Sequence, residues 1–201
     1  MVKSNYKPQE YWTKRGSVYD EEWRKSSLFG IVSNLVKYPQ SYAQARSVVS
    51  EIKLTKPKKV LECGCGTGRI LKMLENNGFE LYGVDFSKTM LATARRKISP
   101  KTVLVQADYT KKIPFPNNSF DTVYTCASLL HVPTKSIRGA CKEIKRVSRK
   151  YIVLSEWVGD TTAMHCFNHD YEKLFSDCEL VSKKRIPLIP DKFTFVFKKR
   201  K

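Results

Sequence analysis

The feature that most constrains the fold of this chain is a glycine-rich turn within residues 60–68, Val-Leu-Glu-Cys-Gly-Cys-Gly-Thr-Gly. A short apolar run ends at Glu62, glycines then occupy every second position, and residues 69–74 follow with the apolar spacing of a helix. Glycine permits positive φ and close approach of the backbone to a ligand, and a helix N-terminus presents free N–H groups. The pattern predicts a strand, a tight turn and a helix that together form a ligand-binding loop.

The spacing of the glycines excludes the dinucleotide fingerprint. Counted from Gly64, Gly-x-Gly-x-x-Gly would need a glycine at the position of Arg69. Glu62 would also repel a diphosphate, whereas it would tolerate or attract a cation without phosphates. The pattern Glu62-x-Gly64-x-Gly66-x-Gly68 instead resembles the signature of class I S-adenosylmethionine (AdoMet)-dependent methyltransferases, of the small-molecule, methyltransferase type 11-like kind.

Apolar runs and helical patterns alternate from residue 57 onward. We expect strands over residues 60–62, 81–85, 102–108, 120–125 and 151–156, helices over residues 69–77, 89–98, 135–148 and 169–177, and a terminal hairpin of residues 180–187 and 193–197. Gly78 is the expected stop of the first helix, and Ser87 and Thr134 are the expected N-caps of the next two. Such alternation predicts a mostly parallel sheet covered on both faces. The resemblance implies an α/β, Rossmann-like class I methyltransferase fold, with a seven-stranded sheet whose last strand is antiparallel.

The first 55 residues precede this alternation. Pro8 suits the first turn of a helix, and a second helical stretch over residues 27–52 is expected to be interrupted near Pro39. The first helix would place Tyr11, Trp12, Arg15, Tyr19 and Trp23 on one face. Core packing is the commoner role of such a stripe, and a lid over the substrate, formed by Tyr11, Trp12, Arg15 and Tyr19, is the alternative. We expect a single methyltransferase domain over residues 1–201, with residues 1–55 as a helical cap or lid and residues 56–201 as the core.

Ligands of such a sheet bind beyond the carboxyl ends of its strands. Asp85 ends the second strand and is expected to accept hydrogen bonds from ribose hydroxyls, with a helix-capping role as the alternative. Asp108 ends the third strand and is expected to accept a hydrogen bond from the adenine amino group, with a loop-capping role as the alternative. The full set of expected cofactor-binding residues is Glu62, Gly64, Cys65, Gly66, Gly68, Asp85, Phe86, Ser87, Asp108, Tyr109 and Cys126.

Candidates for catalysis lie beyond the fourth and fifth strands. They are His131, His169 and Tyr171, while Glu156 and His165 are expected at the substrate. His131 is a candidate base because its ordinary pKa lies near 6.5, and a structural histidine is an equal alternative. His165 and His169 would share a face if their segment were helical, and Cys166 lies beside them. No second ligand cluster supports them, so we expect no metal.

Residues 113–121, Ile-Pro-Phe-Pro-Asn-Asn-Ser-Phe-Asp, resemble closely the stretch before the fourth strand in small-molecule-type members of the family. The resemblance implies a structural role, in which Phe120 packs and Asp121 opens the strand. An Asn/Asp-Pro-Pro-aromatic motif and a Pro-Cys pair are both absent from the sequence. Methylation of planar amino groups, and attack on cytosine C5 through Cys126, are therefore not expected.

The chain is strongly basic, with 37 Lys and Arg against 19 Asp and Glu and a net charge of +18. Such a surface raises encounter rates with polyanions, so a nucleic-acid or ribonucleoprotein partner stays open beside a merely solvated lysine-rich surface. No apolar run approaches the roughly 20 residues of a membrane helix and no apolar signal region begins the chain, so we expect a cytoplasmic protein without a membrane partner. The six cysteines are expected to be reduced and mostly buried.

These observations favour transfer of a methyl group from AdoMet to an acceptor that the sequence does not identify, with a small molecule favoured. A methyltransferase that uses its basic surface to modify RNA or protein is the first alternative. A non-catalytic binding subunit with the same fold is the second, and the intact acidic and glycine positions argue against it.

Overall fold

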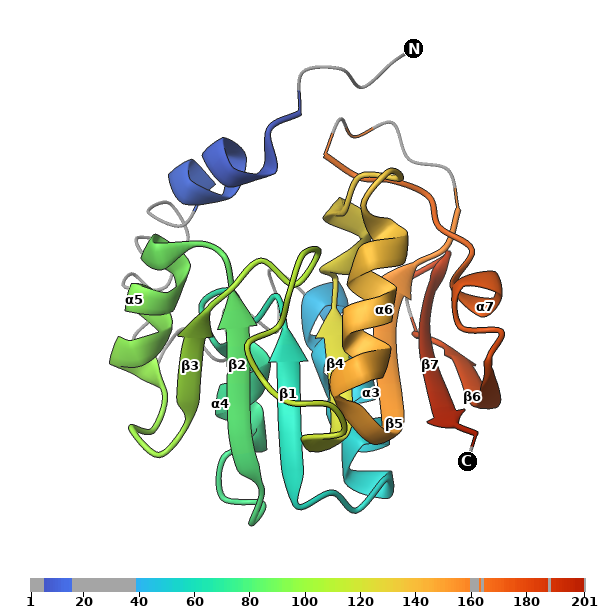
Figure 1. Cartoon of the computed structure of the whole chain (residues 1–201), viewed down its shortest axis with the longest axis horizontal. Helices are drawn as coiled ribbons and strands as arrows, with labels where there is room; N and C mark the ends of the chain where they lie inside the picture. The colour runs from blue at the N-terminus through green and yellow to red at the C-terminus, as the bar shows by residue number, and fades with distance from the viewer. Residues whose placement is uncertain (1–5, 16–38, 160–162, 164, 188, 201) are drawn as a thin grey trace.

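The computed structural model describes residues 6–15, 39–159, 163, 165–187 and 189–200 of the chain. Seven strands form one sheet in the order β3-β2-β1-β4-β5-β7-β6 (Figure 1). Their bounds are β1 Lys59–Cys63, β2 Glu80–Asp85, β3 Val103–Gln106, β4 Phe120–Cys126, β5 Ser148–Trp157, β6 Cys178–Arg185 and β7 Lys192–Lys199. Strands β1 to β5 pair in parallel, and β7 pairs antiparallel with both β5 and β6. The predicted mostly parallel sheet with an antiparallel last strand is confirmed.

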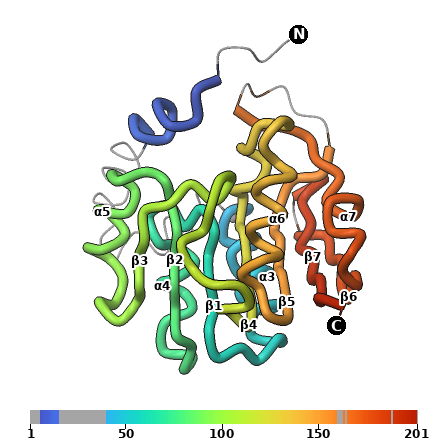
Figure 2. The backbone as a smooth tube through the Cα atoms, viewed as in Figure 1, coloured from blue at the N-terminus to red at the C-terminus, as the bar shows by residue number. Residues whose placement is uncertain are grey.

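Helices cover both faces of this sheet, as predicted (Figures 1 and 2). The helices are α3 Pro39–Leu54, α4 Arg69–Leu74, α5 Lys88–Lys97, the 3₁₀ turn η1 Leu129–His131, α6 Ile137–Val147 and α7 Tyr171–Leu174. A further helix spans residues 8–15. Side chains of α3, α4 and α5 fill one core cluster, while those of α6 and α7 fill the other. The carboxyl ends of the parallel strands are thus left for loops.

Strand β1 illustrates how the sequence sets the two layers. Successive side chains of a strand point to opposite faces. Leu61 and Cys63 therefore belong to the α6–α7 cluster, whereas Val60 belongs to the α3–α5 cluster. All are buried because helices cover both sides, which explains why the strand reads as a continuous apolar run.

Several predicted details of local structure are confirmed. Ser87 is the N-cap of α5, and its hydroxyl accepts a hydrogen bond from the Met90 N–H. Phe120 is buried, and the Asp121 carboxylate accepts hydrogen bonds from the N–H groups of Lys58 and Lys59. Asp121 therefore joins the start of β4 to the start of β1.

Some predicted helix ends are wrong. Helix α4 ends at Leu74 rather than residue 77, since Glu75 leaves the helical conformation and Asn76 takes a positive φ of 62°. Helix α6 follows Ser136 as its N-cap, not Thr134, and ends before Ser148, which begins β5. Helix ends differ from sequence-based bounds by one to three residues at each of these positions.

Helix α3 begins at Pro39, where an interruption was predicted, as suits a residue without an N–H. The predicted helix over residues 169–177 is reduced to one turn, because the Asp170 side chain caps the Lys173 N–H and so begins the helix at Tyr171. His165 and His169 consequently do not share a helical face. Tyr19, Trp23 and the stretch before Pro39 lie outside the described residues.

All six cysteines are free thiols; Cys126 is partly buried and the others are buried. Among the described residues, no helix combines the length and apolar character needed to cross a membrane.

Candidate cofactor and acceptor site

The glycine loop joins β1 to α4 and folds back onto the end of β2. The N–H groups of Gly64 and Cys65 both donate to the Val84 carbonyl, at 2.8 and 3.1 Å. Gly64, Gly66 and Gly68 have φ values of 75°, 51° and 78°, so each position favours glycine. A Cβ on Gly64 would overlap the side chain of Ser128, whereas a Cβ on Gly66 would meet nothing within 4 Å. The loop is therefore packed on one side and open on the other.

Asp85 ends β2 beside the open side of the loop. Its carboxylate is mostly buried and accepts hydrogen bonds from the Gly66 N–H at 2.9 Å and the Ser87 N–H at 2.8 Å. Burial raises the pKa of Asp85, and the two N–H groups partly oppose that rise. A carboxylate has about four lone-pair positions, so two remain for hydroxyl groups of a ligand. This geometry suits the predicted ribose contact.

Glu62 lies on the other side of the loop, in the sheet layer covered by α3 and α4. Its carboxylate is buried and accepts a hydrogen bond from the Tyr124 hydroxyl at 2.9 Å. Burial raises the pKa of Glu62 to about 8, opposed by the Tyr124 hydrogen bond and by Arg69. The predicted direct repulsion or attraction of a ligand by Glu62 is therefore not what this position offers. Glu62 supports the loop from beneath.

The ends of β2 and β3 border the same space. Phe86 is partly exposed, and its carbonyl accepts a hydrogen bond from the Gln106 side chain. The Asp108 carboxylate caps its own loop through Thr110, whose N–H and hydroxyl both donate to Oδ1. Its Oδ2 lies 3.7 Å from the Lys111 ammonium. Asp108 therefore has a capping role and still exposes one oxygen.

Two predicted cofactor side chains, those of Tyr109 and Cys65, point away from this space, and the thiol of a third, Cys126, is partly buried. The Tyr109 ring is buried and its hydroxyl lies 2.7 Å from the Ser128 hydroxyl, so it is not free to stack on a nucleobase. Cys65 is buried with its thiol toward Gly83, which leaves only its backbone at the loop. Burial raises the pKa of Cys126 to about 12, so its thiol stays protonated at neutral pH. The sequence reveals which residues belong to the loops but not which way they face.

Glu156, predicted at the substrate, is instead fully buried. Its Oε1 accepts hydrogen bonds from the Thr125 hydroxyl and from the N–H groups of Ser128 and Leu129, at 2.8 to 3.1 Å. Its Oε2 accepts from the Leu130 N–H at 3.3 Å. Glu156 therefore holds the turn that follows β4 and has no face toward an acceptor.

That turn places His131. Its Nδ1 lies 2.8 Å from the His165 carbonyl oxygen. A carbonyl can only accept, so Nδ1 carries the hydrogen and Nε2 keeps the lone pair. Burial lowers the pKa of His131 to about 4, and the hydrogen bond to His165 opposes this shift. His131 is therefore neutral at pH 7, and its Nε2 makes no hydrogen bond to the residues that the structure describes.

The other two predicted catalytic residues lie in the core. His169 is buried, and its Nε2 donates to the Val132 carbonyl at 2.9 Å. Tyr171 is 1% exposed, and its hydroxyl has no hydrogen-bond partner among the described residues. Burial lowers the pKa of His169 and raises that of Tyr171, so both stay neutral. We replace the predicted proton-handling role with a packing role for both residues.

The helix over residues 8–15 crosses the carboxyl edge of the sheet (Figure 1). Tyr11 stacks on His165 with ring centroids 4.8 Å apart, and Trp12 meets His131 edge-on at 4.7 Å. At its other end the Thr13 carbonyl accepts a hydrogen bond from Thr89 at the start of α5. The helix thus contacts both the predicted adenosine side and the predicted acceptor side. Arg15 is exposed, and Tyr19 lies outside the described residues.

His131, His165 and Cys166 bring their donor atoms within 4.8 Å of one another. The sequence pattern pairs His165 with His169 and does not predict the contact with His131. His131 lies 34 positions before His165 in the chain, and the two meet because the strands that precede them, β4 and β5, are neighbours in the sheet. The Nδ1 hydrogen bond to the His165 carbonyl explains the position of His131 without a metal. The expectation of no metal stays a prediction.

Comparison with known proteins agrees with this geometry. Residues 61–153 match the family model of a methyltransferase domain. This stretch of the chain is therefore similar to a methyltransferase domain. The matched stretch contains the glycine loop, Asp85, Asp108 and the turn with His131, and it ends within β5.

Two curated relatives and one solved structure illustrate the similarity. The chain is 28% identical to sterol 24-C-methyltransferase ERG6B of Gibberella zeae over 146 residues, which is 69% of this chain and 38% of that protein. It is 30% identical to demethylmenaquinone methyltransferase of Staphylococcus aureus over 128 residues, which is 61% and 52% of the two chains. Magnesium protoporphyrin IX methyltransferase of Synechocystis PCC 6803, solved with bound SAM, superposes with a TM-score of 0.73 at 16% identity, covering 96% of this chain and 95% of that one. The chain spans 38–61% of the length of the first curated relatives, so their activities are not transferred to it directly.

Proposed function

We propose that this methyltransferase transfers the methyl group of AdoMet to a small-molecule acceptor bound between the glycine loop and the helix over residues 8–15. The observation that supports this best is the buried Asp85 carboxylate, which is fixed by the Gly66 and Ser87 N–H groups and still has lone pairs to offer. A carboxylate at this place suits the hydroxyls of a ribose.

The cofactor would lie along the carboxyl ends of β1, β2 and β3. Asp85 would bind the ribose, Oδ2 of Asp108 the adenine amino group, and the backbone of the Gly64–Gly68 loop the amino-acid end. Phe86 and Ser87 would border the adenine. Bound AdoMet supplies an electrophilic methyl group on a sulfonium.

The chain's own contribution to catalysis is alignment and exclusion of water. The acceptor's lone pair would attack the methyl carbon as the carbon–sulfur bond breaks, which leaves a neutral thioether. Correct alignment alone can supply about 7–11 kcal/mol of the barrier. If the acceptor carries a proton, the Nε2 lone pair of His131 would receive it.

The chemistry of the side chains near His131 favours an apolar, ring-containing acceptor. Tyr6, Tyr11, Trp12, His165 and Phe167 supply aromatic faces and edges around that residue. The relatives named above act on a sterol and on demethylmenaquinone, and the structural neighbour on a porphyrin. These proteins support a small acceptor of that class. We also propose that the protein is cytoplasmic, because its free thiols suit a reducing compartment.

We further propose that residues 8–15 act as a lid within a single domain. The helix touches α5 through Thr13 and touches the β4 and β5 loops through Trp12 and Tyr11. Entry of AdoMet would require these contacts to open.

Transfer of a tritiated methyl group from AdoMet into fractionated cell extract tests the proposal. We expect label in an organic-extractable small molecule with the wild type, much less label with Asp85→Ala, and a reduced rate with His131→Gln. Label found in RNA or protein would show that the acceptor is a polymer and not a small molecule. The absence of any transferred label, together with no binding of AdoMet, would overturn the proposal.

A further inference from the structure

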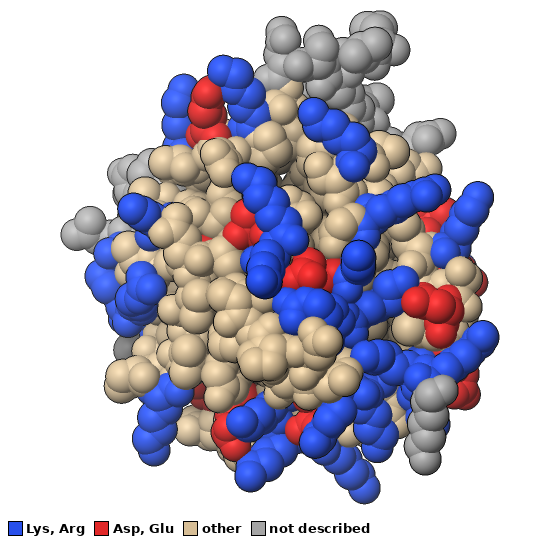
Figure 3. All heavy atoms as spheres, viewed as in Figure 1, with Lys and Arg blue, Asp and Glu red and all other residues tan. Residues whose placement is uncertain are grey.

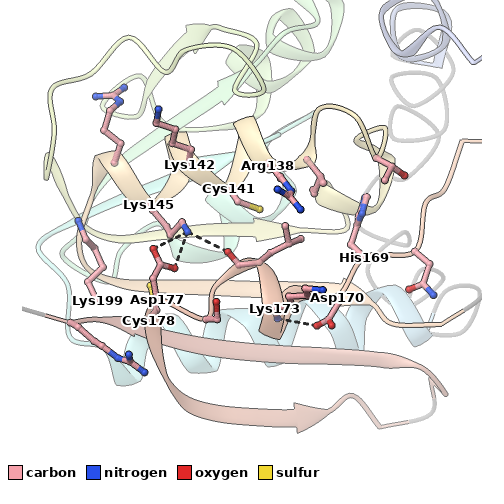
Figure 4. Close-up of a pocket in the computed structure, with 17 residues that line it drawn as sticks. Arg138, Cys141, Lys142, Lys145, His169, Asp170, Lys173, Asp177, Cys178 and Lys199 are labelled. Atoms are coloured by element: carbon pink, nitrogen blue, oxygen red, sulfur yellow. Dashed lines mark hydrogen bonds and ion pairs between the residues drawn. The ribbon is translucent and has the colours of Figure 1, made fainter.

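A basic groove lies between α6 and α7 and closes against the ends of β6 and β7. It encloses about 980 Å³ and is lined by seven Lys or Arg residues and two Asp residues. Figure 3 shows basic side chains gathered on the face of the molecule that α6 covers, and Figure 4 shows the groove itself. The site described above does not use this groove.

The sequence of α6 builds one wall of the groove. Arg138 and Lys142 are four residues apart and therefore lie on one face of the helix, with Lys145 one turn further on. The opposite face buries Ile137, Ala140, Cys141, Ile144 and Val147. The amphipathic pattern that anchors α6 to the sheet thus also produces a basic stripe along its outer side.

Part of this charge is already neutralised, and part is free. Lys145 pairs with Asp177, and Arg146 pairs with Glu143. Among the described residues, no ion pair involves Arg138, Lys142, Lys173 or Arg200, all of which are exposed. The free cations therefore come from α6, α7 and the end of β7, around one concave space.

The groove is also long. Helix α6 has 11 residues, so it extends about 16 Å from the carboxyl edge of the sheet to the opposite edge. At about 3.4 Å per nucleotide of a stacked strand, that length holds four to five nucleotides. The lining residues run from Thr134 and Asn168 at one end to Lys199 and Arg200 at the other.

We propose that this groove binds the sugar–phosphate backbone of a single-stranded nucleic acid. The inference goes beyond the proposed methyl transfer and does not depend on it. A membrane surface fits less well, because Ile137, Cys141 and Cys178 in the lining are buried and the remaining apolar lining residue, Leu174, is partly buried against the core. The lining has no Phe, Tyr or Trp, and the ring of its one histidine, His169, is buried, so recognition is of phosphates and does not read sequence.

The test is fluorescence anisotropy with labelled 20-nucleotide single-stranded RNA and DNA. The groove variant combines Arg138→Gln, Lys142→Gln and Lys173→Gln. The control combines Lys53→Gln, Lys56→Gln and Lys101→Gln, which removes the same charge from exposed positions outside the groove. Thermal melting of both variants checks that they fold, as their exposed side chains lead us to expect.

If each of the four cations without an ion pair contacts one phosphate, the logarithm of the binding constant should fall with the logarithm of the salt concentration with a slope of about −3 for the wild type. Loss of three of these contacts should reduce the size of the slope by about 2. The same relation predicts roughly 100-fold weaker binding of the groove variant at 0.1 M salt, while the control changes by less than threefold. Tight binding of either oligonucleotide supports the proposal. Whether RNA alone or both RNA and DNA bind shows which kind of nucleic acid the groove accepts. Equal weakening by the two variants, or equal affinity of the wild type for polyglutamate, would overturn it.

Discussion

Replacement of Asp85 by asparagine tests the cofactor assignment with almost no change in shape. The carboxylate accepts one N–H on each oxygen, from Gly66 on Oδ2 and from Ser87 on Oδ1. An amide can present its oxygen to only one of them, and its NH₂ group then faces the other donor. The variant also loses the negative charge to which two ribose hydroxyls would donate.

The magnitude follows from these contacts. A hydrogen bond to a charged group contributes about 1.5–3 kcal/mol and a neutral one about 0.5–1.5 kcal/mol. Exchange of the charged acceptor for a neutral one at the ribose should therefore weaken AdoMet binding by about 1.5–3 kcal/mol, or roughly 10- to 150-fold. Asp85→Ala, which removes both oxygens, should weaken it at least tenfold as well.

Calorimetric titration with AdoMet measures this loss, and Asp121→Asn is the matched control. Asp121 also accepts two backbone N–H groups, from Lys58 and Lys59, but it lies at the opposite edge of the sheet. Both variants should melt at lower temperature, while only the Asp85 variant should bind AdoMet more weakly. If Asp85→Asn bound AdoMet with wild-type affinity, the ribose assignment would be refuted.

Three further predictions concern the parts that support the site. Gly64→Ala should lower the melting temperature more than Gly78→Ala, since the two positions have φ values of 75° and 77° but only the first added Cβ overlaps another side chain; equal losses would contradict the packing argument. Glu156→Ala should lower the free energy of unfolding by about 3–5 kcal/mol, and the melting temperature by roughly 6–20 °C, because it leaves buried N–H groups without their acceptor. A fall in melting temperature of less than about 2 °C would show that the turn holds without Glu156. Burial raises the pKa of Glu62 from 4.5 to about 8, so its contribution to stability is present below pH 4.5 and is lost as pH rises toward 8. The melting temperature of the wild type relative to Glu62→Gln should therefore fall between pH 5 and pH 8, and a constant difference across that range would contradict the assignment.

The sheet, its parallel order and the glycine loop could be predicted because each depends on local patterns. The apolar run before Glu62, the alternation of strands and helices, and the cap at Ser87 are visible in short windows of sequence. Helix ends were less predictable, since α4 ends beside the positive φ of Asn76 and α7 begins at the side-chain cap of Asp170, and neither residue type alone fixes a boundary. Local patterns indicate that an element exists better than they indicate where it stops.

Side-chain direction at the site was the least predictable property. Glu156 and Tyr109 lie in loops or at strand ends that do border the site, yet both point into the core, where Glu156 caps a turn and Tyr109 meets Ser128. A polar residue at the end of a strand can serve a ligand or serve the loop beside it, and both roles need the same chemistry. Only the positions of the neighbouring N–H groups decide between them.

The contact between His131 and His165 follows from strand order rather than from spacing in the sequence. Because β4 and β5 are neighbours in the sheet, the loops that leave their carboxyl ends must run side by side, so residues far apart in the chain meet there. The helical spacing of His165 and His169 predicted a different pairing, and it failed because the segment between them is not helical. In a doubly wound sheet, acceptor-site residues are therefore better sought by pairing the loops of adjacent strands than by periodicity within one loop, and this argument singles out His131 as the base to test first.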